Sequence, residues 1–275
     1  MPKILGKLSE NIKPGICLLI YGDTSSGKTH SAITGIPRIL HLNKEPKDPR
    51  LVHSIIRPDY HEIIDYVEFE GFEDETEYLN KLILAYKAGD RPYETIFHDG
   101  LTFTMAFYKQ ALEDDRFTAK ELSKKEEDRP RPGLVDRASM ERKDWGTLAS
   151  LTARETRLLH ELSKFGLMVV STAIAGEYPK WNSTIKVAPS LTGQEFPKLI
   201  HGWFDTIGYI ISPFHMLPGG QVSEPKVSFV STDDGMGNSY MCRANPLVVR
   251  AEQKYGPLPL NLEKIAKIIR GEFKI

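Results

Sequence analysis

The feature that most constrains the fold is a glycine-rich segment, Gly22–Thr29, that directly follows an apolar run. It fits the pattern G-x-x-x-x-G-K-[ST] at every fixed position. The preceding Ile16–Tyr21 is almost wholly apolar, like a strand buried on both faces of a parallel sheet. Glycines let backbone amides point inward at phosphate oxygens, and a helix beginning near Lys28 adds its positive dipole end. The segment therefore predicts a phosphate-binding loop in an α/β fold.

The side chains of this loop have separate expected roles. Lys28 is expected to reach the β- and γ-phosphates of ATP, and the Thr29 hydroxyl to take one position around Mg²⁺. The rest of the loop, expected to surround the phosphates, consists of Gly22, Asp23, Thr24, Ser25, Ser26 and Gly27. The competing interpretation is a Gly/Ser-rich turn with an exposed lysine, which the neighbouring strand and helix patterns disfavour. ATP and Mg²⁺ are therefore the expected cofactors.

Strand and helix patterns alternate along the rest of the chain. Short apolar runs predict further strands at Ile39–Leu42, Tyr66–Phe69, Tyr93–His98, Leu167–Thr172, Thr206–Ser212 and Val227–Val230. Helical spacing predicts two helices, Glu75–Ala88 capped by Asp74 and Trp145–Phe165 between Asp144 and Gly166. This alternation predicts an α/β fold with a mostly parallel sheet and helices on both faces. The length suits one large domain or two small ones. No internal repeat is found, and residues 1–275 are expected to form a single domain.

Phosphoryl transfer also needs acidic side chains beside the loop. Asp99 ends the run Thr95–Asp99, which places a carboxylate where it would hold Mg²⁺ through water. Many ATPases place a water-activating Glu directly after that Asp, but here the residue is Gly100. Glu45, at the end of the second apolar run, is expected to take that role. The alternatives are a turn aspartate and an exposed turn glutamate. Lys28, Asp99 and Glu45 are therefore the expected catalytic residues.

Other polar residues of the predicted strands have less specific signals. Thr172 either senses the γ-phosphate or is a β-branched strand residue, and the sequence leaves both open. His41 and His98 are expected to be packed strand residues, since no spacing of Cys and His residues suggests a metal site. Cys17 and Cys242 are expected to be reduced thiols.

Two long segments interrupt the alternation. Residues 113–144 are dense in both charge signs and poor in large apolar residues, so we expect a charged, mobile insertion. Residues 173–198 form a second long connection directly after the strand predicted at Leu167–Thr172. Because long loops in compact domains are often functional, 173–198 is expected to be a second functional loop.

The charge balance excludes a globally basic nucleic-acid coat. The chain of 275 residues carries 36 Lys and Arg against 37 Asp and Glu, a formal net charge of −1. A polyanionic partner would therefore have to meet local patches of positive charge. No apolar stretch suits a signal peptide or a membrane span, so we expect a cytoplasmic protein without a membrane partner.

Taken together, the motifs resemble those of the RecA-like P-loop ATPases of bacteriophages. That family is often described as phage nucleotide-binding proteins and includes the Sak-type single-strand annealing proteins. The stretches that carry the resemblance span most of the chain and are Tyr21–Thr29, Glu45, Ile96–Thr102, Met168–Ala173, Trp203–Gly208 and Val249–Gly256. The first is common to all P-loop proteins, so only the combination points to this family.

The resemblance implies a RecA-type core with an extra strand between the strands that carry Lys28 and Asp99. Such cores assemble side by side as homo-oligomers, with ATP at the subunit interface and a basic group reaching in from the neighbour. Arg250 and Lys254 match the region that supplies this group. The sequence departs from the family at 252–253, where Glu-Gln replaces an Asp-Arg pair. A phage-encoded protein would act in the host cytoplasm.

The resemblance also implies where single-stranded DNA would bind. RecA-like proteins contact DNA through the loops after the Asp-bearing strand and the next strand, which here are 113–144 and 173–198. In the second loop, Lys180 and Lys186 would contact the DNA backbone and Trp181 would stack on a base. The alternative is that Trp181 anchors the loop onto its own domain.

The favoured function is ATP binding and hydrolysis by a RecA-like phage protein that acts on single-stranded DNA in recombination or strand annealing. A single-strand-binding protein would be a further partner. The alternative is a P-loop ATPase that works as a motor or switch on a protein partner, without direct DNA binding. A GTPase is disfavoured, because Asn43–Pro46 neither matches the Asn-Lys-x-Asp element of GTP recognition nor lies late in the chain. A kinase would need a lid and an acceptor pocket, which the sequence does not reveal.

Overall fold

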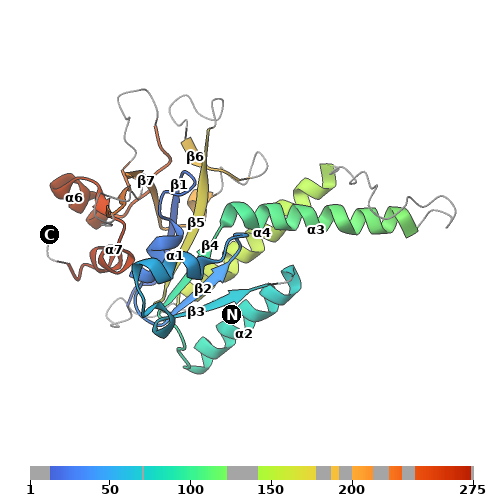
Figure 1. Ribbon diagram of the computed structural model, residues 1–275, viewed down its shortest axis with the longest axis horizontal. Helices are drawn as coiled ribbons and strands as arrows, with labels where there is room; N and C mark the ends of the chain where they lie inside the picture. The colour runs from blue at the N-terminus through green and yellow to red at the C-terminus, as the bar shows by residue number, and fades with distance from the viewer. Residues whose placement is uncertain are drawn as a thin grey trace, which may run out of the picture.

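A mostly parallel β-sheet forms the centre of the protein (Figure 1). The computed structural model describes residues 13–69, 71–122, 142–177, 187–191, 200–212, 223–230 and 239–273. The strands of these residues are β1 (Ile16–Gly22), β2 (Ile39–Asn43), β3 (Ile64–Glu68), β4 (Thr95–Asp99), β5 (Met168–Glu177), β6 (Val187–Pro189), β7 (Thr206–Ser212), β8 (Lys226–Ser228) and β9 (Leu258–Pro259). The strand order is β3-β2-β4-β5-β1-β7-β8-β9, with β6 paired to β5.

Helices connect these strands. They are the 3₁₀ helices η1 (Thr29–Thr34), η2 (Tyr60–Glu62) and η4 (Ile200–Gly202), and the α-helices α1 (Pro49–Ile56), α2 (Phe72–Ala88), α3 (Leu101–Leu122), α4 (Arg142–Ser163), α6 (Pro246–Tyr255) and α7 (Leu262–Ile269). In the described part of the chain, no helix is both long enough and apolar enough to cross a bilayer.

The neighbouring strands β3, β2, β4, β5, β1 and β7 pair in parallel. Strand β8 pairs antiparallel with β7, and β9 pairs antiparallel with β8. Every residue of β1, β2 and β4 is buried, as expected for strands covered on both faces. The prediction of an α/β fold with a mostly parallel sheet is therefore confirmed.

The order of the central strands positions the phosphate-binding loop relative to Asp99. Strand β5 lies between β1, which leads into Lys28, and β4, which ends at Asp99. In register, Ile16 of β1 and Thr95 of β4 both face Met168 of β5. The extra strand that the RecA resemblance implied is thus present between the two strands. The fold is a RecA-like P-loop arrangement by its strand order.

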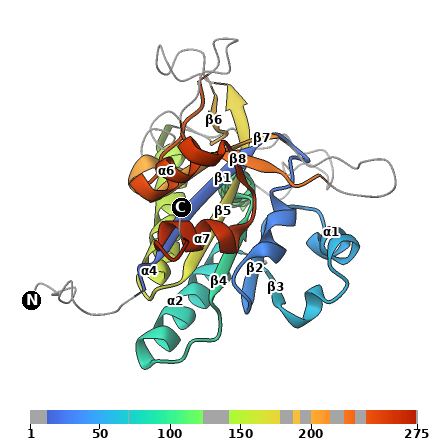
Figure 2. The same ribbon diagram turned by 90° about the vertical axis from the view of Figure 1, so that its left-hand side faces the viewer.

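Helices cover both faces of the sheet. The side chains of β1 alternate between these faces, so each face contributes to a separate core. Ile16, Leu18 and Ile20 pack in a core with residues of η1, α6 and α7. Cys17, Leu19 and Tyr21 pack in a second core with residues of α3 and α4. A third core joins α2 and α4 to β2, β4 and β5. Figure 2 shows α6 and α7 in front of the sheet, on the side opposite α3 and α4.

Several local predictions differ from the structure at helix starts. Helix α2 begins at Phe72 after Gly71, so Asp74 lies in its first turn and does not cap it. Asp144 likewise lies in the first turn of α4, which begins at Arg142. Gly166 adopts φ +87°, the left-handed conformation predicted for the helix end. The helix after the phosphate loop is a 3₁₀ helix rather than an α-helix.

The two long segments are partly regular structure. Residues 113–122 belong to α3 and 142–144 to α4, so the predicted insertion is helical at both ends, whereas 123–141 lie outside the described residues. Helix α3 projects away from the sheet in Figure 1. Of 173–198, residues 173–177 extend β5 and 187–189 form β6. The predicted DNA contacts Lys180, Trp181 and Lys186 fall outside the described residues.

Candidate nucleotide-binding site

The phosphate loop leaves β1 at Gly22 and curls back on itself. A side chain at Gly22 would lie 2.9 Å from Ser26 Oγ and 3.1 Å from Ile210 Cβ, so the close packing of the loop requires glycine there. Ser25 and Gly27 adopt positive φ values of 63° and 96°. These turns bring the loop from the end of β1 into η1 at Thr29.

Lys28 lies at the centre of this loop. Its Nζ donates to the backbone oxygens of Gly22 at 2.9 Å and Asp23 at 2.7 Å, and lies 3.4 Å from Ser26 Oγ. Burial lowers the pKa of Lys28, while the nearby Glu45 and Asp99 oppose that shift. A buried ammonium held by backbone dipoles is the group expected to meet phosphate oxygens.

A cavity of about 460 Å³ opens beside the loop. Its lining residues are Thr24, Ser25, Gly27, Lys28, Thr29, His30, Glu45, Pro46, Lys47, Val52, Phe103 and Ile174. This volume lies in the range of small-molecule and cofactor sites. The loop residues and Glu45, predicted separately from sequence, therefore share one cavity.

Asp99 is fully buried at the carboxyl end of β4. It accepts a hydrogen bond from Thr172 Oγ1 at 2.6 Å, and His41 Nε2 lies 3.4 Å from its Oδ2. Burial alone would raise the pKa of Asp99, but the interactions with His41, Thr172 and Thr29 outweigh it and lower the pKa. Asp99 is therefore ionised at neutral pH.

A magnesium ion fits the two oxygen donors predicted for it. The Thr29 side chain helps to lower the pKa of Asp99, so its hydroxyl lies close enough to the carboxylate to interact with it. A hydroxyl and an ionised carboxylate are the oxygen ligands that Mg²⁺ prefers. His41, predicted as a packed strand residue, is buried as expected and also contacts Asp99.

Thr172 connects Asp99 to the next residue of the chain. While its hydroxyl donates to Asp99, the backbone N–H of Gly100 donates to Thr172 Oγ1 at 2.9 Å. The side chain is fully buried in β5. The sequence left open whether Thr172 senses the γ-phosphate or is a β-branched strand residue. The structure adds a third role, because the hydroxyl is a buried hydrogen-bond bridge between Asp99 and Gly100.

Glu45 lies against Gly100, the position where many ATPases carry the water-activating glutamate. Gly100 has φ +107°, and a Cβ there would lie 3.3 Å from Glu45 Cγ. Burial and the charge of Asp99 raise the pKa of Glu45, and Lys28 opposes the shift. The Glu45 side chain, from the turn after β2, thus lies beside the position that directly follows Asp99.

The sequence missed the support beneath Thr29. Helix α1 carries His53, whose Nε2 lies 2.9 Å from the Thr29 backbone oxygen, and whose Nδ1 contacts Tyr66 Oη. Burial lowers the pKa of His53 to about 4, so this imidazole is neutral. The signal that could have located α1 is Asp48 followed by Pro49, since the Asp48 side chain caps the helix.

The predicted trans-acting residues lie elsewhere. Arg250 and Lys254 are exposed on α6 and are not among the residues lining the cavity. Between them, Glu252 is buried and accepts hydrogen bonds from Ser228 Oγ and from Phe229 N at 2.8 Å. Glu252 therefore has a structural role within its own subunit. Cys17 and Cys242 are both free, as predicted.

Comparisons with known proteins leave the family open. No family model matches the chain, and no curated protein matches it. Among solved structures, it is similar to a KaiC-like protein from the hyperthermophilic archaeon Pyrococcus horikoshii OT3. The two share 14% sequence identity over 78% of this chain and 77% of that chain, with a TM-score of 0.40.

Proposed function

We propose that the protein binds and hydrolyses ATP as a RecA-like P-loop ATPase. The observation that carries this proposal is the meeting of Lys28, Thr29 and Glu45 in one cavity beside the ionised Asp99. These residues come from the ends of β1, β2 and β4, which the parallel sheet brings to one edge. Cation, metal donors and base are the parts that phosphoryl transfer to water requires.

Each side chain has a distinct part in the proposed reaction. The loop amides and the Lys28 ammonium hold the phosphates and stabilise negative charge that develops during transfer. Thr29 and Asp99 would hold Mg²⁺, which supplies Lewis-acid stabilisation of the phosphate oxygens when bound. Glu45, with its raised pKa, accepts a hydrogen bond from the attacking water and orients it. Thr172 keeps Asp99 in place.

The experiment compares Lys28→Ala and Glu45→Gln with an exposed control, Lys87→Ala, at the end of α2. Loss of the Lys28 charge-assisted contacts, about 1.5–3 kcal/mol, should weaken ATP binding roughly 10- to 150-fold. Glu45→Gln should retain binding and lower kcat about 10²- to 10⁴-fold. If Lys28→Ala leaves ATP binding unaffected, the proposed binding site is refuted. If GTP binds more tightly than ATP, the assignment of ATP as the nucleotide is refuted.

We further propose that the ATPase acts on single-stranded DNA in phage recombination or strand annealing. The support is the resemblance of its motifs to the phage RecA-like family and the Lys180, Trp181 and Lys186 set in the loop after β5. The test is a salt-dependent shift of labelled single-stranded DNA that Lys180→Ala with Lys186→Ala removes. Absence of a shift both with and without an ATP analogue would refute the DNA role.

The second candidate is a motor or switch that acts on a protein partner. Its support is the near-neutral net charge of −1 and the projection of α3 away from the sheet, where a partner could bind it (Figure 1). Stimulation of ATP hydrolysis separates the two candidates. Single-stranded DNA should raise the hydrolysis rate if DNA is the partner, whereas a rate that DNA leaves unchanged favours the protein partner.

A further inference from the structure

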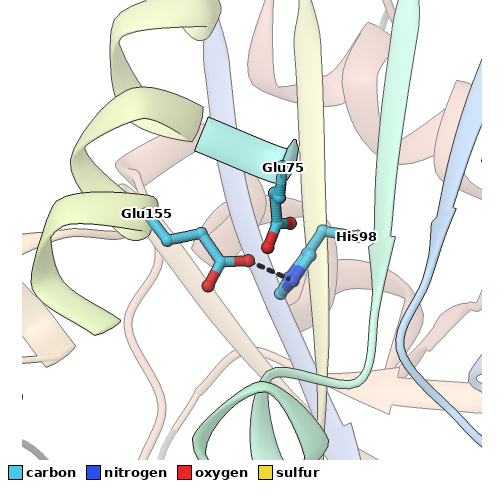
Figure 3. Close-up of side chains that lie close together, drawn as sticks. All are labelled: Glu75, His98 and Glu155. Carbon is cyan, nitrogen blue, oxygen red and sulfur yellow. Dashed lines mark ion pairs between the residues drawn. The ribbon is translucent and has the colours of Figure 1, made fainter. Parts of the chain in front are cut away.

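A buried polar cluster lies on the opposite side of the sheet from the Asp99 carboxylate. It consists of Lys44, Glu75, His98, Tyr108 and Glu155, contributed by the end of β2 and by α2, β4, α3 and α4. The side chains of Lys44 and Glu75 are only 6% and 1% exposed. Figure 3 shows Glu75 and Glu155 pointing toward the His98 imidazole. No residue of this cluster lines the nucleotide cavity.

Hydrogen bonds and ion pairs connect the members of the cluster. Lys44 Nζ donates a hydrogen bond to Glu75 Oε2, and Tyr108 Oη lies 3.3 Å from the same oxygen. Tyr108 also donates to Glu155 Oε2 at 2.8 Å, and His98 Nε2 lies 2.9 Å from Glu155 Oε1. Lys44 thus contacts α2 directly through Glu75, and Tyr108 connects Glu75 to α3 and α4.

A metal ion is the other occupant that this chemistry suggests, since one ligand atom each from Glu75, His98 and Glu155 lie within 4.8 Å of one another. The Lys44 ammonium, however, already provides a positive charge in contact with Glu75. Burial and the charge of Glu155 raise the pKa of Glu75, which favours the neutral form of this ligand. A dication bound here would also lie close to the buried Lys44 ammonium, and the two positive charges would repel each other.

The cluster meets the nucleotide site through the backbone of Lys44. Its N–H donates to the Asp99 backbone oxygen at 3.0 Å, which continues the pairing of β2 with β4. The neighbouring Asn43 Nδ2 donates to the backbone oxygens of Glu45 at 3.1 Å and Lys47 at 3.3 Å. Lys44 points into the cluster, while the next residue, Glu45, lines the nucleotide cavity.

We propose that Lys44 is a positioning residue for Glu45: its anchorage on Glu75 fixes the turn that holds the Glu45 side chain against Gly100 and in the nucleotide cavity. This inference depends on the proposed ATP hydrolysis for its catalytic consequence. Phe69 and Phe107 enclose the Lys44 ammonium at 4.9 and 5.6 Å from their ring centres, which further restricts its position. A base held in this way loses less freedom when it orients water.

The first test is a double-mutant cycle on hydrolysis, with Lys44→Met, Glu45→Gln and the combination. Lys44→Met should lower kcat at least about tenfold while changing the affinity for an ATP analogue less than about threefold. In the Glu45→Gln background the same change should have almost no further effect, because both act through one carboxylate. If the fold-decrease in kcat of the combined variant equals the product of the two single decreases, the residues act independently and the proposal is overturned. The exposed control Lys87→Met should leave kcat unchanged.

Lys44→Met leaves Glu75 without its partner and can prevent folding. The second variant therefore replaces both partners, Lys44→Met with Glu75→Met, so that neither end of this contact stays buried without its partner, while Glu155 keeps its contacts with His98 and Tyr108. This protein should fold, bind the ATP analogue and still lose hydrolysis. Wild-type kcat in the double variant would overturn the proposal, as would a stoichiometric metal that copurifies with the wild type and is lost in Glu155→Gln.

Hydrogen exchange tests the positioning without hydrolysis. If the wild type binds ATP but does not hydrolyse it, the proposed function fails. The exchange rate of the turn that Lys44 is proposed to anchor can still be measured in that case. The double variant should show faster exchange of the amides of residue 44, Glu45 and Lys47, with no change in the loop amides of 23–29. Unchanged exchange at these three positions would overturn the anchoring role of Lys44.

Discussion

The Thr172 hydroxyl donates to the Asp99 carboxylate at 2.6 Å and accepts the Gly100 backbone N–H at 2.9 Å. This buried bridge joins β5 to the end of β4, across the two strands that are paired in register. It fixes both the carboxylate proposed for Mg²⁺ and the glycine against which Glu45 lies. The bridge therefore holds Asp99 and Gly100 together, and through Gly100 it bears on Glu45, the proposed catalytic base.

The bridge predicts the effect of replacing Thr172. Thr172→Val keeps the shape but leaves the Gly100 N–H and one Asp99 oxygen without their partner, and should destabilise the protein by about 1–3 kcal/mol. Thr172→Ser keeps the hydroxyl and should lose less stability. Urea denaturation of the two variants measures which is more stable, and the m-value of unfolding should be unchanged. The kcat of ATP hydrolysis should also fall in the valine variant. Equal stability of the two variants would show that the hydroxyl contributes nothing.

Gly100 predicts a second effect that combines strain with the site. Gly100→Ala places a Cβ at φ +107°, and this atom would lie 3.2 Å from Phe103 and 3.3 Å from Glu45. The change should destabilise the protein by about 1–2 kcal/mol and lower kcat by displacing Glu45. The control is Gly146→Ala in α4, where a Cβ meets nothing within 4 Å. That control should stabilise by about 0.5–1 kcal/mol with unchanged kcat.

The buried polar cluster predicts a pH dependence of stability. The pKa of Glu75 is raised by burial and by the charge of Glu155, so the folded state keeps a proton that the unfolded state releases. Its contribution is fully present below the unfolded pKa, about 4.3, and is lost as the pH rises toward the raised pKa. Glu75→Gln should therefore lose less stability between about pH 5 and pH 8 than the wild type.

Chemical denaturation at both pH values measures this difference. The control is Glu73→Gln, an exposed residue of the same helix, which should keep the wild-type slope. Burial would raise the pKa of Glu155, but His98 and Lys44 outweigh it and lower that pKa, so its contribution is lost only as the pH falls below about 4.3. A wild-type slope in Glu75→Gln would show that Glu75 is ionised throughout.

The exposed basic residues of α6 lead to a test of assembly. If Arg250 and Lys254 reach the site of a neighbouring subunit, Arg250→Ala with Lys254→Ala should lower kcat without weakening ATP binding. Mixing this protein with Lys28→Ala should restore part of the activity, because some sites then combine an intact loop with an intact neighbour. A mixture that stays inactive would argue against a shared site. Light scattering with an ATP analogue measures the accompanying assembly.

Sequence patterns with strictly local causes were predicted well. Strand β7 has the predicted bounds, and β1 differs by one residue at Gly22. Helix starts were less predictable, as at Phe72, because an N-cap depends on the backbone before the helix and several acidic residues compete for that position. Helix α3 was missed since its second half is charged and lacks an apolar stripe.

The sequence by itself determined the chemistry of the loop, because Gly22, Gly27, Lys28 and Thr29 act through one short segment at fixed spacing. Only the tertiary structure decided which distant groups meet that loop. The strand order placed Glu45 against Gly100, and the packing of the helices brought Lys44, Glu75 and Glu155 into one buried polar cluster. Such contacts depend on which strand ends lie together and on what burial does to charge, and neither can be read along the chain.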